Sequence, residues 1–148
     1  MNITLKGLKQ FNGMDGVAFT AKLCFDGKVV GTVMNDGNGG SNSYHGVKSH
    51  LLQKPDYDAL IKAANDAGHT GTECEDIFIE DIMCDMDAEK AHKKFQKKGF
   101  KFTAYFVGVD MWQDNVLIGF NDKKAIAKEL KDKKLKLRKI FGEEVAHA

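Results

Sequence analysis

Asp26-Gly27 lies between two runs of strand-forming residues, and no other feature of this sequence constrains the fold as strongly. Over residues 17–25, large apolar residues alternate with smaller or polar ones, which is the period of a half-buried strand. Residues 28–33 (KVVGTV) form the second run. Asp-Gly favours a type I′ turn because both central residues of that turn need positive φ. The sequence therefore predicts a β-hairpin that turns at Asp26-Gly27.

The hairpin belongs to a larger meander. A short strand with Ile3, Leu5 and Leu8 precedes it, and residues 35–42 (NDGNGGSN) follow it. Glycine, asparagine and aspartate tolerate the backbone conformations of tight loops, so this loop is expected to end the sheet. The first third of the chain is therefore predicted to form three antiparallel strands.

Helical spacing dominates the middle of the chain. Residues 57–64 place apolar side chains at i, i+3, i+4 and i+7, after a proline and before Gly68. Residues 74–86 are ambiguous, because IFI alone suits a strand, whereas the length and apolar stripe favour a helix. Asp87 is expected to cap a further helix that gathers lysines in its last turn and ends at Gly99.

The last third contains a second hairpin and a final helix. Residues 101–109 and 115–120 are the expected strands, and Asn121 or Asp122 is expected to cap a helix. Residues 135–141 add a short strand. Inward positions of the expected helix are Ile126, Ala127 and Leu130.

Strands that cluster along a chain, rather than alternating with helices, indicate an α+β fold. We expect an antiparallel sheet made from the N-terminal three-strand meander and the C-terminal hairpin, packed with three to four helices. The 148 residues suit a single domain, residues 1–148. Residues 142–148 are candidates for a disordered tail.

Composition excludes several classes of protein. The 22 Lys+Arg against 21 Asp+Glu exclude a strongly basic nucleic-acid binder or a strongly acidic DNA mimic on the whole-chain average. No apolar run reaches the ~20 residues of a membrane span, and the first residues do not resemble a signal peptide. The three cysteines form no CxxC pair, which indicates free thiols in a reducing compartment. We therefore expect a cytoplasmic protein without a membrane partner.

The charges are distributed unevenly along the chain. Residues 49–89 contain 11 acidic residues and 2 lysines, whereas residues 90–140 contain 15 Lys+Arg and 5 acidic residues. Such asymmetry between segments suggests an interaction surface. Trp112, in a polar connector, would be costly to leave in water unless it packs on the core or on a partner. The candidate residues for binding a protein are Trp112, Met111, Glu75, Asp76, Glu80 and Asp81.

The lysine-rich segment supports an alternative, because lysines bind phosphates and aromatic side chains stack on bases. The chain has only one arginine, the residue that most often reads bases, which weighs against this alternative. The candidate residues for binding nucleic acid are Lys93, Lys94, Lys97, Lys98, Lys101 and Tyr105.

The glycine-rich loop is a third candidate site. Several backbone N–H groups of such a loop can point toward one anion, although the loop has no P-loop motif. A calcium loop is disfavoured, because Val47 stands where the loop would need a glutamate. The candidate residues for a small ligand or anion are Gly37, Gly39, Gly40, Ser41 and His45.

No metal or cofactor is predicted. His69, Cys74, Cys84 and His92 are ligand types that zinc accepts, but their spacing fits no compact two-plus-two zinc site. No pair of residues is singled out for acid–base or nucleophilic catalysis. A non-catalytic role is therefore favoured, and catalysis stays open.

The block from Asp26 to Tyr44 matches DGKxxGxVxNDGxGGxNxY. In this block the chain resembles an uncharacterised family of small proteins from bacterial genomes and their phages, whose later helices and hairpin match Glu75–Lys98 and Phe100–Leu130. The resemblance implies a phage or mobile-element context and no activity. We expect an accessory protein in the bacterial cytoplasm that binds and modulates or inhibits a host protein, with a defence factor as one candidate. The oligomeric state, monomer or dimer, stays open.

Overall fold

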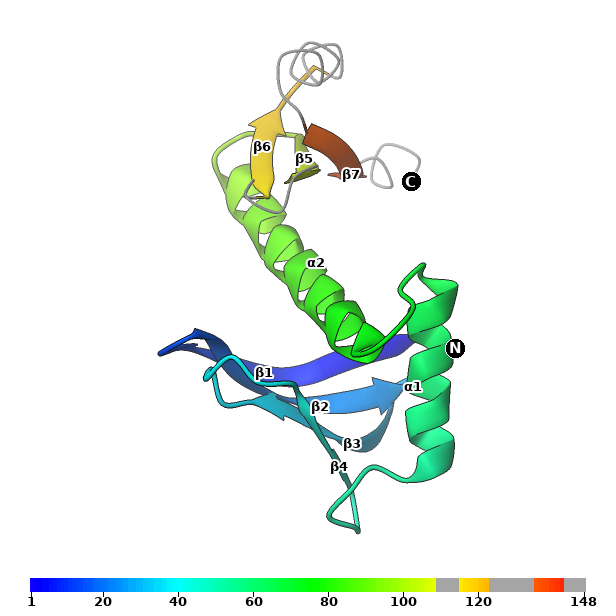
Figure 1. Cartoon of the computed structure of the whole chain (residues 1–148). Helices are drawn as coiled ribbons and strands as arrows, with labels where there is room; N and C mark the ends of the chain where they lie inside the picture. The colour runs from blue at the N-terminus through cyan, green and yellow to red at the C-terminus, as the bar shows by residue number, and fades with distance from the viewer. Residues whose placement is uncertain (109–114, 123–134, 143–148) are drawn as a thin grey trace. The chain divides into compact units, whose positions relative to one another are not determined.

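A computed structural model describes residues 1–108, 115–122 and 135–142. The chain divides into two compact units, an N-terminal unit that ends at Met83 and a C-terminal unit that begins at Cys84. Each unit has its own antiparallel sheet (Figure 1). The α+β class is confirmed, whereas the expectation of one sheet built from both ends of the chain is wrong. That residues 1–148 form one domain stays a prediction.

The N-terminal sheet is a meander of four strands, one more than expected, in the order β1-β2-β3-β4. The predicted turn is confirmed, because Asp26 and Gly27 have φ of 50° and 83° and Phe25 pairs with Lys28. The first strand continues beyond its expected end to a second tight turn, at Met14-Asp15. The strands are β1 (Ile3–Gly13), β2 (Gly16–Phe25), β3 (Lys28–Asn35) and β4 (Ser43–Gly46).

The two faces of this sheet differ in burial. Along β2, Phe19, Ala21 and Leu23 are buried, whereas the intervening Thr20 is half-buried and Lys22 is exposed. Residues directly opposite one another share a face, so the strand register assigns every position. We call the face of Phe19 the inner face and the opposite one the open face. Beyond one end, formed by Thr4, the fully buried Cys24 and Val29, the open face consists of Lys6, Lys9, Phe11, Ala18, Thr20, Lys22, Thr32, Met34, Ser43 and His45.

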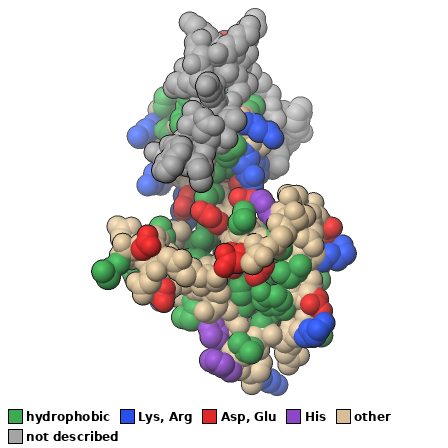
Figure 2. Space-filling model, in the orientation of Figure 1, with side chains coloured by type: hydrophobic (Ala, Val, Ile, Leu, Met, Phe, Trp, Pro, Cys, Tyr) green, Lys and Arg blue, Asp and Glu red, His purple; other side chains and the backbone are tan. Residues whose placement is uncertain are grey.

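Helix α1 (Lys54–Asp66) follows the meander and buries Leu60 and Ala64. Pro55 lies in its first turn, where no N–H is needed, and Gly68 has φ of 94° just beyond its end. Its exposed side carries lysines and carboxylates next to one another (Figure 2). This helix confirms the prediction from the apolar spacing.

Helix α2 (Cys74–Lys97) is one continuous helix, so the expectation of two separate helices in this segment is wrong. Asp87, expected to cap the second one, lies inside α2. No glycine or proline interrupts the segment, and the buried stripe continues through Ile79, Met83, Ala88 and His92. The ambiguity of residues 74–86 is thereby resolved in favour of helix. As predicted, Gly99, with φ of 95°, follows the helix end.

The C-terminal sheet has the order β6-β5-β7. The predicted hairpin is confirmed by the pairing of Phe102 with Phe120, and the predicted last strand pairs with the other edge of β5. That pairing completes a separate sheet. The helix expected after Asn121 lies outside the described residues, as does the expected tail apart from Gly142. The strands are β5 (Phe102–Gly108), β6 (Val116–Phe120) and β7 (Leu135–Phe141).

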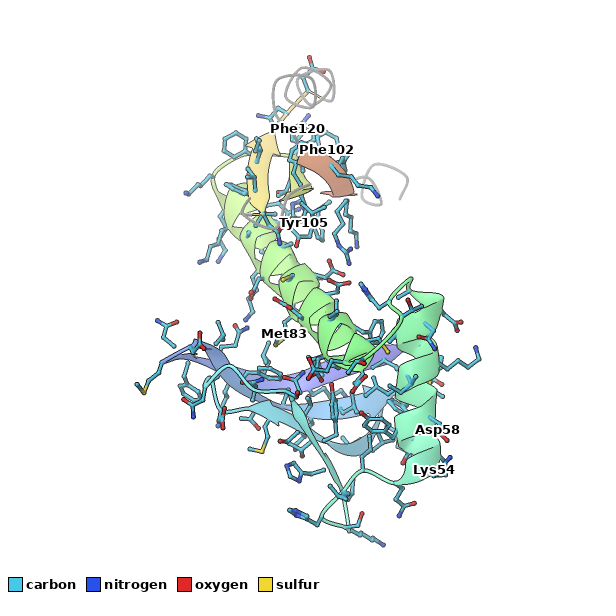
Figure 3. The ribbon with its side chains drawn as sticks, viewed as in Figure 1. Lys54, Asp58, Met83, Phe102, Tyr105 and Phe120 are labelled. Carbon is cyan, nitrogen blue, oxygen red and sulfur yellow. The ribbon has the colours of Figure 1, made fainter. Side chains whose placement is uncertain are left out.

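Both faces of β5 are buried. Ala104 and Phe106 belong to an apolar cluster with Phe120, against which Phe102 and other half-buried side chains of the sheet pack (Figure 3). On the opposite face, Thr103 and Tyr105 are buried, and Thr103 hydrogen-bonds to His92 of α2. Both faces of β5 therefore contribute side chains to the core of the C-terminal unit.

Candidate functional site

The glycine-rich loop packs against the turn of the β1–β2 hairpin. The Asp15 N–H donates to the Gly37 carbonyl at 2.8 Å. Gly37 has φ of 75°, and a Cβ there would lie 2.9 Å from the Gly13 Cα. A Cβ on Gly39 would lie 2.6 Å from Asp15 Oδ2. Gly37 is therefore required by a close backbone approach and by positive φ, and Gly39 by positive φ.

The loop is also closed by its own polar side chains. Asn35 Nδ2 donates to the Gly40 carbonyl at 3.0 Å and to Asn42 Oδ1 at 2.9 Å. The Gly37 N–H donates to Asn35 Oδ1, and the Asn38 N–H donates to a carboxylate oxygen of Asp36. These two N–H groups are thus already used inside the loop, although an anion site there stays a prediction.

Ser41 and His45, the two side chains predicted to assist that site, have partners elsewhere. The Ser41 hydroxyl donates to Glu73, and His45 Nδ1 lies 2.8 Å from the His50 carbonyl oxygen. The structure therefore spreads the five predicted anion-site residues over a loop and a strand, with a carboxylate next to Ser41.

The acidic start of α2 forms a hydrogen-bonded network with two tyrosines of the N-terminal unit. Tyr44 Oη donates to Asp76 Oδ1 at 2.7 Å, and the Asn42 N–H donates to Asp76 Oδ2 at 3.1 Å. Tyr57 Oη donates to Glu75 Oε1 at 2.6 Å. The two tyrosine rings meet edge to face with centroids 5.7 Å apart. Figure 2 shows carboxylates gathered over this start of the helix.

Burial governs the chemistry of this network. It raises the pKa of the Tyr44 and Tyr57 hydroxyls, the Asp76 carboxyl and the Cys74 thiol above their ordinary values. The tyrosines are therefore neutral donors, and the cysteine is not an activated thiolate. Carboxylates near a helix N-terminus are also favoured by the helix dipole.

The four acidic residues predicted to bind a partner have different environments. Glu75 is buried and Asp76 is half-buried, and both are engaged in the tyrosine network. Asp81 Oδ2 lies 2.6 Å from Nε2 of His69. Glu80 is exposed. Of the four, Glu80 is thus the most accessible to a partner.

Large apolar side chains are exposed at the tip of the β1–β2 hairpin, which the sequence reasoning missed. The exposed fractions are 60% for Phe11, 97% for Met14 and 50% for Val17. The signal that would have found them is Gly13-Met14-Asp15-Gly16, a two-glycine turn that Val17 follows directly and Phe11 precedes by two positions. The hairpin tip thus combines a tight turn with exposed apolar side chains, and the glycine-rich loop packs against this turn.

The predicted nucleic-acid residues lie in the C-terminal unit with different exposure. Lys93, Lys94, Lys97, Lys98 and Lys101 are exposed at and beyond the end of α2. Tyr105 is 3% exposed, accepts a hydrogen bond from Asn115 Nδ2 at 3.0 Å, and has its pKa raised to about 12 by burial. The lysines remain accessible to a phosphate, whereas Tyr105 cannot stack on a base in this conformation.

Among the described residues, no three His, Cys, Asp or Glu side chains gather as they would around a metal ion. His69 pairs with Asp81, Cys74 donates to Glu75, and His92 contacts Thr103. Trp112 and Met111, predicted to bind a partner, lie outside the described residues.

Within the described residues, no helix has the length and apolar character needed to cross a membrane. No family model matches the chain. Neither the curated proteins nor the solved structures include a significant match to it.

Proposed function

We propose that this protein acts by binding another protein, and not by catalysis. The resemblance in the Asp26–Tyr44 block provides the context of the proposal, an accessory factor of a phage or mobile element in the cytoplasm of a bacterial host. In that context the partner is a host protein whose activity the binding modulates or inhibits. A host defence factor is one candidate.

The exposed tip of the β1–β2 hairpin is the observation that carries the proposal. Met14 is almost fully exposed at the turn, and Val17, on the strand that follows it, is half exposed, whereas the exposed Phe11 lies on the opposite face of the hairpin. Grouped large apolar side chains on a surface mark sites where a partner excludes water, and such anchors supply most of the binding energy. The Asp15–Gly37 hydrogen bond holds the tip in place, which reduces the ordering cost of binding.

The other residues predicted for this role fit the proposal unequally. Glu80 is exposed and can lie at the rim of an interface, whereas Glu75 and Asp76 maintain the fold through the tyrosine network. Trp112 and Met111 stay candidates from the sequence. The proposed interface is therefore centred on the hairpin tip.

The test is affinity capture from host lysate, followed by a binding measurement with the purified captured protein. Met14→Ser together with Val17→Ser should weaken that binding by tenfold or more, because truncation of a central anchor typically costs more than about 1.4 kcal/mol. The matched control is Val47→Ser together with Leu51→Ser, which removes two side chains of 64% and 68% exposure elsewhere in the same unit.

Equal binding by the tip variant and the control variant would refute the hairpin tip as the interface. Catalytic turnover of a small molecule by the purified chain, unaffected by the tip variant, would refute the proposal of a non-catalytic role.

A further inference from the structure

The open face of the N-terminal sheet has an unusual composition. Its ten strand positions hold three lysines and a histidine, and none of the ten is a carboxylate. Six of these side chains are exposed and four are half-buried. The acidic residues of the same unit lie in turns and loops, on α1 and at the start of α2, where Asp76 accepts a hydrogen bond from Tyr44 of the inner face. The formal charges at these ten positions of the open face are thus all positive.

Two of the lysines are placed at the closest cross-strand spacing. Lys6 of β1 is directly opposite Lys22 of β2, and Lys9 lies in the next row of the same face, opposite Thr20. Side chains directly opposite one another have Cβ atoms about 5 Å apart, and like charges there repel. An anion bound across this pair would relieve the repulsion that the free sheet retains.

The lysines are accompanied by groups that suit the other parts of a nucleotide. The hydroxyls of Thr20, Thr32 and Ser43 lie on the same face, and hydroxyl side chains commonly contact phosphate oxygens. Phe11 is 60% exposed, opposite the small Ala18, so its ring has room for a stacked base. A surface that bound only an acidic protein would need these lysines, but it would not need the exposed ring of Phe11 on the same face.

We propose that the open face binds single-stranded nucleic acid without sequence preference. Lys6, Lys9 and Lys22 neutralise phosphates, and Phe11 stacks on a base. A single strand fits because its bases are free to stack on the exposed ring of Phe11, whereas the bases of a duplex are already stacked on one another. Base reading is not expected, because the only arginine of the chain, Arg138, belongs to the other unit.

The proposal is distinct from docking at Met14 and Val17, which do not belong to the open face, and from the lysines at the end of α2. The test measures fluorescence anisotropy of a labelled 20-nucleotide oligo(dT) and of oligo(U) with the full chain, from 20 to 200 mM salt. Three phosphate contacts predict a slope of log K against log salt of about −2. Lys6→Gln with Lys22→Gln should reduce the steepness of that slope by about 1.4.

Phe11→Ala should weaken binding about 5- to 100-fold, as expected for one lost base stack, with the salt slope unchanged. The matched control is Lys54→Gln with Lys62→Gln. It removes the same charge from the same unit, at lysines paired with Asp58 and Asp66, and it should leave both affinity and slope unchanged.

Four results would overturn the proposal. The first is no binding of either oligonucleotide at 20 mM salt. The second is an equal effect of the open-face and control pairs. The third is a loss of oligonucleotide binding in the variant Lys97→Gln with Lys98→Gln but not in the open-face variant, which would assign binding to the end of α2. The fourth is equal binding of polyglutamate or duplex DNA without dependence on Phe11, which would assign the face to any polyanion.

Discussion

The two sheets of this protein bury their strands in different ways. In β2 buried and accessible positions alternate from Ala18 to Leu23, and only its last three residues are buried in succession, whereas in β5 the four consecutive residues from Thr103 to Phe106 are all buried. A strand with one solvated face needs an apolar residue only at every second position, while a strand covered on both faces needs a packing residue at each. The N-terminal sheet can therefore carry a binding surface, whereas the central strand of the C-terminal sheet serves packing on both of its faces.

The largest effect should come from truncating the core of the C-terminal sheet. Phe106 is 1% exposed and packs in the cluster with Ala104 and Phe120, so Phe106→Ala should lower the free energy of unfolding by about 3–5 kcal/mol. Phe11→Ala, on the open face, should change it by less than about 0.5 kcal/mol. Urea unfolding followed by circular dichroism measures both. Equal losses for the two variants would contradict the difference between the sheets.

A smaller effect should follow from removing one hydroxyl of the tyrosine network. Tyr57→Phe leaves the buried Glu75 without its 2.6 Å donor, which should cost about 1–3 kcal/mol in unfolding free energy. Adding Glu75→Met removes the buried carboxylate that has lost this donor, so the double variant should be more stable than the single one. If the double variant is the less stable of the two, Glu75 has a role other than accepting this hydrogen bond.

The strand pattern was predictable wherever a local rule decides the structure. Asp26-Gly27 specifies its turn through positive φ, and the alternation of β2 specifies its faces. Asp87 misled the prediction because capping residues also occur inside helices when an apolar stripe continues past them. The separation into two sheets could not be predicted, because the pairing of β5 with β7 is a choice among distant strands that no local pattern encodes.

The candidate surfaces were predictable only in part, and for a related reason. Charge counted along the chain located the acidic start of α2 but could not show that Tyr57 and Tyr44 bind its carboxylates. Lys6 and Lys22 are 16 positions apart in the sequence, and only strand register places them opposite one another. Register also places Phe11 on the same face of the sheet as these two lysines. Which residues share one surface of a sheet thus depends on how the strands pair, whereas the residues that share one surface of a helix can be identified from their spacing in the sequence.

Acid should affect the two units in opposite directions. Burial raises the pKa of Asp76, so its contribution to stability is present below the ordinary value of about 3.9 and is lost as pH rises through the raised value. Burial lowers the pKa of His92, so its contribution is present above about 6.5 and is lost as pH falls through the lowered value. Acidification from pH 7 should therefore weaken the C-terminal unit and favour the N-terminal one.

Amide hydrogen exchange in β2 and β5, corrected for the intrinsic pH dependence, measures this difference unit by unit. Asp76→Asn should flatten the pH profile of β2 alone, and His92→Asn should flatten that of β5 alone. A common pH profile in both strands that neither substitution alters would assign the pH dependence to other groups.

The smallest effect should come from the ion pair between β7 and α2 within the C-terminal unit. Arg138 Nε and Nη2 each lie 2.9 Å from an oxygen of Asp85, with both side chains more than a third exposed. Arg138→Lys loses the bidentate geometry of this pair. Because both side chains are partly exposed to solvent, the expected loss of unfolding free energy is less than about 1 kcal/mol. Lys136→Arg, at an exposed position of the same strand, is the control. A loss approaching that of Phe106→Ala would mean that the carbon chain of Arg138 packs in the C-terminal core, and that the edge strand β7 contributes to this core as much as β5 does.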